Sequence, residues 1–246
     1  AYDKAGNHAS VEQTFDIDVS PPTLTATYRP ANDLGWHGQN VWIAFAAEDQ
    51  PGLSGLEFVG PPDAVTNDGA GQVISCLARD VAGNVSTRDV TINLDKTPVE
   101  ILTFSPRDTE TTPDARPLIR VDFREALSGL DRDNSILKLD DQDVMALATV
   151  TSTNLTYQPA DLMEGSHTVF ARLQDRAGNV TERDAIWAVD SDGLDNLWEQ
   201  QFLGTLALGP GDDADLDGLN NMEELLAGTD PGSGDTDGDG IGDLTD

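Results

Sequence analysis

The first three quarters of the chain alternate hydrophobic and polar residues in short runs separated by turn-forming residues. The runs cover residues 41–49, 72–79, 85–94, 118–125, 166–173 and 180–189. A period of two residues predicts β-strands with one face buried, and helical periodicity is almost absent here. We therefore predict a mainly β chain built from sandwiches.

A turn motif, Asp-x-Ala-Gly-Asn, occurs three times, at residues 3–7, 80–84 and 175–179. Alternating runs at 11–19, 85–94 and 180–189 follow the three copies. Gly and Asn tolerate a left-handed backbone, and Asp can accept hydrogen bonds from the amides of its own turn. Each copy therefore predicts a β-hairpin. A second repeat, Leu-Ser-Gly-Leu, follows the runs that end near residues 49 and 125.

The spacing of these motifs predicts the domain organisation. Their glycines lie 77 and then 95 residues apart, the size of immunoglobulin-like domains. We predict the final turn and strand of a truncated repeat in residues 1–20, immunoglobulin-like sandwiches in 21–97 and 98–189, and a separate module in 190–246. The chain is thus expected to be a piece of a longer protein. Its orphan first strand is expected to pair with a missing domain or to be donated to a neighbouring molecule.

Composition changes after Val189, because residues 190–246 contain thirteen Asp, three Glu and neither Lys nor Arg, in a chain of net charge −31. A solvated, disordered tail is one interpretation. The acids are spaced periodically, however, and alternate with two short helical segments that end at Gly204 and Gly228. We therefore predict a small folded module, whose core is expected to contain Trp198, Phe202, Leu203, Met222, Leu225 and Leu226.

The segment 213–224 fits the Asp-x-Asp-x-Asp-Gly-x₅-Glu pattern of a calcium-binding loop. Ca²⁺ takes six to eight oxygen ligands, and alternate acidic residues around a glycine turn converge on one point. The predicted ligands are Asp213, Asp215, Asp217, the Leu219 carbonyl, Asn221 and Glu224.

Two further segments repeat this spacing. In the segment 235–246 the predicted ligands are Asp235, Asp237, Asp239, the Ile241 carbonyl, Asp243 and Asp246. A weaker copy upstream offers Asp190, Asp192, Asn196 and Glu199, but Ala188 stands where the first carboxylate is expected. The alternative for this copy is a helix N-terminus that carries favourable acids.

The acidic region resembles thrombospondin type 3 repeats, on the Asp-x-Asp-x-Asp-Gly-Ile-Gly-Asp core at 235–243 and the apolar residue at loop position 7. The resemblance implies a calcium-stabilised fold, here without disulfides, since Thr245 stands where animal members carry cysteine. Dockerin modules are the nearest rival, although they place a longer helix after each loop. The preceding region resembles the tandem immunoglobulin-like repeats of bacterial surface and secreted proteins, through its Asp-x-Ala-Gly-Asn hairpins and Thr-Pro linker.

No catalytic constellation is evident, so we do not expect an enzyme. His8, His37 and His167 fall in unrelated contexts, and no serine elbow or phosphate-binding loop occurs. An anionic surface repels nucleic acid. We predict an extracellular or cell-surface, structural or adhesive spacer of a larger bacterial protein, stiffened by Ca²⁺. Its expected partners are calcium, another protein, a cell-surface or polysaccharide ligand, or copies of itself; no membrane span is expected in this segment.

Two alternatives stay open at this point. The first is an accessory region of a secreted hydrolase, which docks the enzyme to a partner or binds carbohydrate. The second is the subunit of a self-assembling extracellular fibre, formed by strand donation. For sugar binding, Trp36 is the more plausible exposed ring, and Trp42 is expected in a core. Asp49, Asp80, Glu125 and Asp175 are either a further cation site or simple turn-capping residues.

Overall fold

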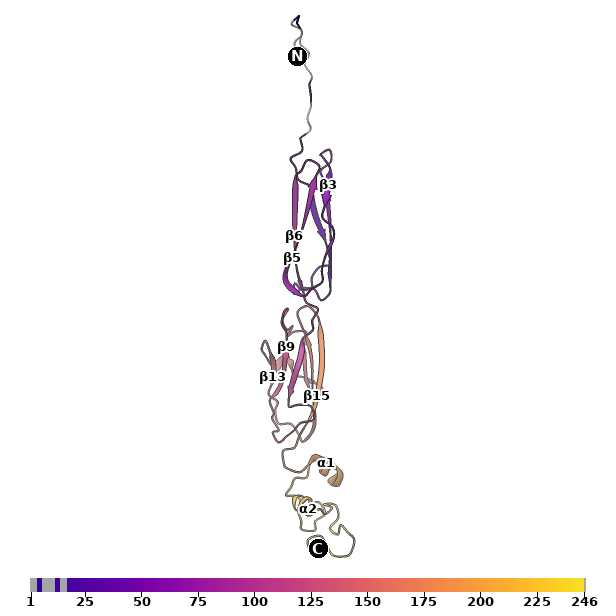
Figure 1. Cartoon of the computed structure of the whole chain (residues 1–246). Helices are drawn as coiled ribbons and strands as arrows, with labels where there is room; N and C mark the ends of the chain where they lie inside the picture. The colour runs from indigo at the N-terminus through magenta and orange to yellow at the C-terminus, as the bar shows by residue number, and fades with distance from the viewer. Residues whose placement is uncertain (1–3, 6–11, 14–16, 246) are drawn as a thin grey trace. The chain divides into compact units, whose positions relative to one another are not determined.

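The computed structural model describes residues 4–5, 12–13 and 17–245 and is mainly β (Figure 1). It divides into two compact units, Ala1–Lys96 and Thr97–Asp246. The hairpin expected at residues 3–7 and most of the strand expected at 11–19 lie outside the described residues. Within the described part, no helix is both long and apolar enough to cross a membrane.

Unit 1 is a sandwich of two three-stranded sheets, ordered β1-β2-β4 and β3-β5-β6. Its strands are β1 (Thr23–Thr27), β2 (Val41–Glu48), β3 (Leu56–Val59), β4 (Asp63–Val65), β5 (Gly69–Asp80) and β6 (Val85–Leu94). Apolar residues of both sheets form one core, led by Val41 and Ile43 of β2 and Ile92 and Leu94 of β6. This strand order is that of an immunoglobulin-like sandwich.

The sandwich of unit 2 has sheets ordered β12-β13-β9-β7 and β11-β10-β14-β15-β8. Its strands are β7 (Glu100–Ser105), β8 (Thr111–Thr112), β9 (Ile119–Arg124), β10 (Ile136–Leu139), β11 (Gln142–Asp143), β12 (Thr149–Val150), β13 (Asn154–Tyr157), β14 (Gly165–Gln174) and β15 (Val180–Val189), with a 3₁₀ turn at Met145–Leu147. Figure 1 shows β9 and β13 on one side and β15 on the other. Phe123, Leu155, Leu173 and Trp187 from the two sheets pack in one core, which again gives the immunoglobulin-like arrangement.

The Asp-x-Ala-Gly-Asn motif forms the same turn in both units. Asp80 accepts hydrogen bonds from the Asn84 backbone N–H and side-chain Nδ2, both at 2.8 Å. Asp175 accepts the same pair from Asn179, at 2.9 and 2.8 Å. The intervening Gly83 and Gly178 have φ of 95° and 94°, a conformation that favours glycine. The predicted hairpins, β5–β6 and β14–β15, are therefore confirmed, and β6 and β15 have the predicted bounds.

The acidic region after β15 contains two short helical segments. Helix α1 (Asn196–Trp198) continues into a π-helical turn, Glu199–Leu203, and helix α2 spans Asn221–Ala227. Gly204 and Gly228 end these segments in the left-handed conformation, as predicted. Between and after the helices the chain runs through turns that carry most of the acidic residues.

Two predictions about aromatic and apolar side chains were wrong. Trp42 is 72% exposed, because Val41 and Ile43 occupy the buried face of β2 and residue 42 must point to the other face. In the acidic region Leu226 is 79% exposed, and Phe202 is also exposed. The most buried side chains there are Leu194, Asn221, Glu199 and Glu224. The other four predicted core residues are half-buried: Trp198, Leu203, Met222 and Leu225.

Candidate metal centre

The segment 213–224 folds into a tight acidic loop followed by α2. The Asp213 carboxylate accepts from Leu216 N at 2.6 Å and from Gly218 N at 3.0 Å. Asp215 and Asp217 accept from the amides of Asp217 and Leu219, at 3.1 and 2.8 Å. These bonds use one oxygen each of Asp215 and Asp217 and direct the three acids towards one point, where each offers an oxygen within 4.8 Å of the others.

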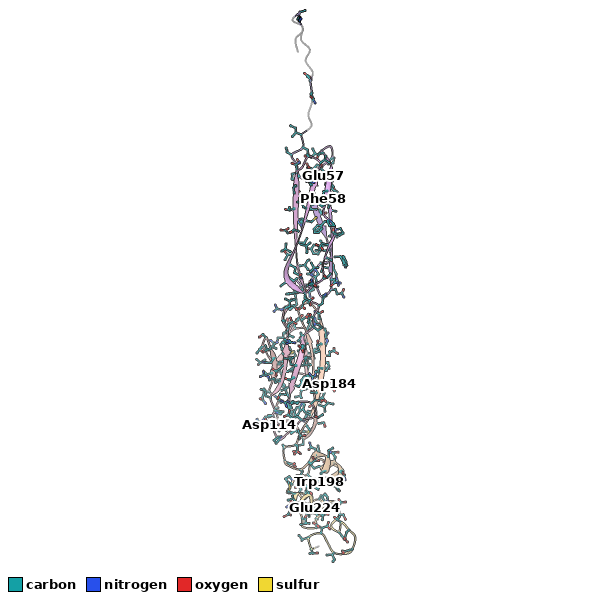
Figure 2. All side chains as sticks on the ribbon, in the orientation of Figure 1. Glu57, Phe58, Asp114, Asp184, Trp198 and Glu224 are labelled. Carbon is teal, nitrogen blue, oxygen red and sulfur yellow. The ribbon has the colours of Figure 1, made fainter. Side chains whose placement is uncertain are left out.

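Glu224 lies on helix α2 (Figure 2), close enough to Asp215, Asp217 and Asp213 to be repelled by their charges. Asn220 caps the helix and forms a reciprocal capping box with Glu223, which fixes the first turn. Glu224 faces inward and is 0% exposed. Neither of its carboxylate oxygens has a hydrogen-bond partner among the described residues.

Five buried oxygens of this loop lack a partner within the described part of the chain: Asp215 Oδ2, Asp217 Oδ2, Asn221 Oδ1, and Glu224 Oε1 and Oε2. Buried polar atoms in folded proteins are nearly always hydrogen-bonded, and an unpaired buried carboxylate is costly. A hard divalent cation would satisfy all of them, since Ca²⁺ prefers carboxylate and amide oxygens. The residues present therefore fit the ion that the sequence predicted.

Electrostatics in this loop make the Glu224 carboxylate easier to protonate than an exposed glutamate when no cation is present. Burial, with repulsion from Asp215, Asp217, Asp213 and Asp243, raises the pKa of Glu224 to about 7. Burial also raises the pKa of Asp215. A cation that binds here must therefore displace a proton at acidic pH.

The raised pKa of Glu224 predicts that the calcium-free stability of the acidic region and its calcium affinity change with pH in opposite directions. The pKa of Glu224 in the folded chain is about 7, above its ordinary 4.5, so the folded state binds more protons than the unfolded state between these values. In calcium-free buffer the stability of the acidic region is expected to fall as pH rises from about 4.5 to about 7, whereas calcium affinity is expected to rise. Thermal melts and titrations at several pH values measure both. Glu224→Gln is expected to reduce both trends in part, because the pKa of Glu199 in the same region is also raised to about 7.

The weaker copy forms a second cluster at the end of the sandwich. Asp190 and Asp192 each bring a carboxylate oxygen within 4.8 Å of the other and of Glu164, which precedes β14. Glu199 is 0% exposed, and both of its oxygens lack a partner among the described residues. Burial, with repulsion from Asp192, Glu164, Asp190 and Asp195, raises the pKa of Glu199 to about 7. Sequence reasoning missed Glu164, which lies outside the repeated loop spacing.

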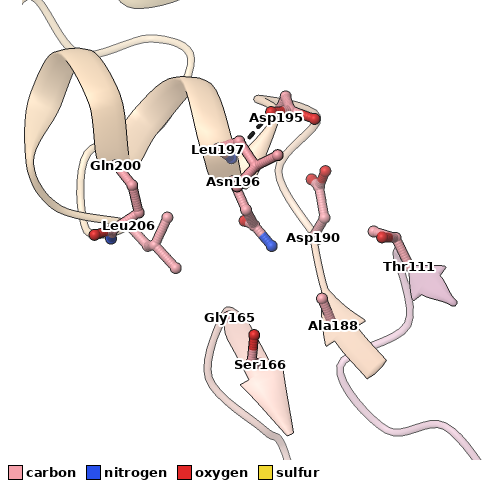
Figure 3. Close-up of a pocket in the computed structure, with 10 residues that line it drawn as sticks. All are labelled: Thr111, Gly165, Ser166, Ala188, Asp190, Asp195, Asn196, Leu197, Gln200 and Leu206. Atoms are coloured by element: carbon pink, nitrogen blue, oxygen red, sulfur yellow. Dashed lines mark hydrogen bonds between the residues drawn. The ribbon is translucent and has the colours of Figure 1, made fainter. Parts of the chain in front are cut away.

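The two clusters share details beyond their acids. Asn196 donates from Nδ2 to the Val189 carbonyl, and Asn221 donates from Nδ2 to the Gly209 carbonyl, both at 2.9 Å. Asn196 lines a cavity of about 420 Å³ between α1 and β14, with Asp190, Gly165 and Ser166 (Figure 3). Both asparagines keep a buried Oδ1 without a partner in the described structure, so each offers an amide oxygen besides its acids.

The last loop, 235–245, has a different environment. Asp235, Asp237 and Asp239 each offer an oxygen within 4.8 Å of the others. The two oxygens of Asp243, however, accept from the backbone and hydroxyl of Thr236, at 2.9 and 2.7 Å. Ile241 is 48% exposed, and Asp246 lies outside the described residues. Calcium binding by this loop stays a prediction.

Carboxylates also gather in unit 1, where Asp18, Asp49 and Asp80 offer oxygens within 4.8 Å of one another. All six oxygens accept hydrogen bonds from Ser20, Ser54, Gln50, Gly55 and Asn84. In unit 2, Glu125 likewise accepts from Leu127 N and Gly129 N, and Asp175 from Asn179. These acids cap turns, in contrast to the unpaired carboxylates of the acidic region.

Comparison with known proteins gives matches among solved structures. No family model matches the chain, and no curated protein does. The titin domains I67–I69 share 10% identity over 70% of this chain and 66% of theirs, with a TM-score of 0.40. The tetra-tandem repeat in the extending region of a large adhesion protein shares 18% identity over 78% of this chain and 55% of its own, with a TM-score of 0.38.

The fibronectin(III)-like modules of CbhA from Clostridium thermocellum share 9% identity over 71% of this chain and 98% of theirs, with a TM-score of 0.31. This chain therefore covers between 55% and 98% of the length of these three structures. Each TM-score lies below 0.5, so the assignment of the fold rests on the strand order of the two sandwiches themselves.

Proposed function

We propose that the chain is a non-enzymatic, calcium-stabilised spacer of a larger extracellular bacterial protein, with immunoglobulin-like sandwiches followed by a thrombospondin type 3-like region. The observation that carries this proposal is the group of buried, unpaired oxygens around Glu224 in the described structure. They lie in a chain whose net charge is −31, where a divalent cation relieves repulsion as well as satisfying the oxygens.

Asp213, Asp215, Asp217, the Leu219 carbonyl, Asn221 and Glu224 would hold one ion in this proposal. The ion neutralises clustered carboxylates and ties the loop to α2, so its binding free energy becomes folding free energy for the acidic region. Calcium outside cells is millimolar and keeps even weak sites filled. This favours an extracellular or cell-surface location and a role in spacing or presentation.

Isothermal titration of the whole chain with calcium tests this function, after the protein has been freed of metal. We expect at least one site with a dissociation constant at or below about 10⁻⁴ M, the tight-binding end of the range for extracellular calcium modules. Titration with magnesium is the control, because Mg²⁺ demands a stricter octahedral geometry and keeps its water. A chain that gives no calcium-specific heat contradicts the proposal.

A second candidate function, carbohydrate binding, is favoured by the exposed ring of Trp42 on the outer face of β2. The ring lies beside small side chains, since Ala44 and Ala46 follow it on the same face of β2 and Thr25 and Thr27 lie across the ladder on β1. An exposed indole beside small side chains suits stacking against a sugar ring.

Electrophoresis in gels that contain soluble polysaccharides tests this second candidate. If sugar stacks on Trp42, Trp42→Ala is expected to weaken retardation about fivefold or more, corresponding to roughly 1 kcal/mol of aromatic contact. Phe58→Ala is the matched control, because Phe58 is an exposed aromatic residue on the opposite sheet. Equal retardation of all three proteins speaks against this role.

A further inference from the structure

The β14–β15 hairpin brings an acid from the sandwich to the acidic region. Gly165 at the start of β14 pairs with Val189 at the end of β15. Glu164, directly before β14, and Asp190, directly after β15, therefore lie at the same end of the hairpin, although 25 residues separate them in the sequence. The position of Glu164 is thus set by the register of the sandwich and not by the loop spacing.

The spacing of the repeated loop explains why the cluster of Asp190 and Asp192 takes a carboxylate from outside the loop. In the repeated pattern the first acid would stand at Ala188, but Ala188 lies within β15 and pairs with Ser166. The alanine side chain has no oxygen, so position 188 supplies no side-chain ligand for a cation. Glu164 lies across the ladder from the loop and brings a carboxylate oxygen within 4.8 Å of those of Asp190 and Asp192.

Glu164 is held in place by hydrogen bonds and by backbone geometry. Its Oε1 accepts from Ser191 N at 2.7 Å and from Ser191 Oγ at 2.8 Å. Gly165 has φ of 112°, which favours glycine and turns the chain sharply into β14. A Cβ at this glycine would also meet Leu206 of the acidic region at 3.2 Å.

Glu199 supplies an independent sign of a ligand. Its side chain is wholly buried, and neither oxygen finds a partner among the residues that the structure describes. The Ser191 bonds account for one oxygen of Glu164, but nothing in the described chain accounts for the carboxylate of Glu199. A cation between Glu199 and the three clustered acids would account for this carboxylate.

We propose that Glu164 is a ligand of a calcium ion that Asp190, Asp192 and Glu199 also hold, so that the ion fastens the acidic region to the end of the β14–β15 hairpin. This inference rests on the proposed calcium function and extends it to a site with one ligand from the sandwich. The ion joins residues before β14, after β15 and in the turn that follows α1. It therefore restrains the start of the acidic region relative to the sandwich of the same unit.

Calcium titration of the isotope-labelled full chain, followed by NMR, tests the inference at single amides. In the unaltered protein, calcium is expected to shift the amides of both Gly193 and Gly218, which report on the two clusters. In Glu164→Gln the Gly193 response is expected to require about 10- to 100-fold more calcium, because affinity depends on the number of charged ligands. The Gly218 response is expected to stay unchanged.

Companion variants separate ligand loss from misfolding. Glu164→Asp keeps a carboxylate and is expected to restore part of the affinity, whereas Glu199→Gln is expected to reproduce the loss. Asp184→Asn, an exposed acid on β15, is expected to titrate as the unaltered chain does.

A Gly193 response that is unchanged in Glu164→Gln, or a native chain that responds only at Gly218, overturns this inference and leaves the proposed function standing. A native chain that responds at neither amide overturns both.

Discussion

Removal of calcium is expected to unfold the acidic region, residues 190–246, while unit 1 keeps its melting temperature. When free calcium exceeds the dissociation constant about 100-fold, each site contributes roughly 2.7 kcal/mol to the stability of the folded form. Without the ion, the carboxylates of Asp213, Asp215, Asp217 and Glu224 crowd one another and five buried oxygens have no partner in the described structure. The small apolar core of this region cannot offset that cost, since Leu226 and Phe202 are exposed.

Calorimetric melts in calcium and in a chelator measure this effect. Unit 1 serves as an internal control, because the six carboxylate oxygens of its Asp18–Asp49–Asp80 cluster are hydrogen-bonded within the protein. A melt in magnesium at equal ionic strength separates ion binding from screening. Superimposable melts with and without calcium would count against a metal-stabilised region.

The sequence carried most of the information about the sandwiches because their strands and turns are specified locally. The alternation of β6 and β15 runs directly from the Asp-x-Ala-Gly-Asn turn, so both strands could be predicted with their observed bounds. The turn itself needs only an acid that accepts from Asn84 or Asn179 and a glycine with positive φ. Such features depend on residues close together in the chain.

Trp42 shows that the alternation of residues along a strand does not predict which face of the strand is buried. Alternation shows that residues 41 and 43 share one face of β2 and residues 42 and 44 the other, but it does not say which face is buried. Residue type suggested that the indole would be inside. The structure buries Val41 and Ile43 at 1% exposure each and leaves the larger ring outside, because the core of unit 1 is built from aliphatic side chains of both sheets.

The candidate metal ligands could be predicted from the sequence where they lie close together in the chain. Asp213, Asp215, Asp217 and Glu224 follow from spacing, and the structure brings the three aspartates together with a buried Glu224 beside them. Glu164 could not be found in this way, because only the pairing of Gly165 with Val189 brings it to Asp190. The sequence does hold one signal for Glu164. It is an acid directly before a predicted strand, and the hairpin partner of that strand leads into the acidic region.

Glu224→Gln is expected to weaken calcium binding at the loop 213–224 about 100-fold, which corresponds to roughly 2.7 kcal/mol. Glu224 is the wholly buried acid of the loop, and both of its oxygens lack partners in the described part of the chain. The amide of Gln offers one neutral oxygen and an NH₂ group in place of two charged oxygens, so it cannot chelate the ion. The measurement is a calcium titration by calorimetry, with the Gly218 amide followed by NMR.

Glu223→Gln is the matched control, because Glu223 neighbours Glu224 in α2 but is exposed. Its side chain completes the capping box at the Asn220 amide, a role that Gln can also fill. Calcium affinity in this control is therefore expected to match that of the unaltered chain. Equal affinity in Glu224→Gln would instead show that Glu224 is not a ligand. Its buried, unpaired carboxylate would then be a cost that the fold bears without calcium.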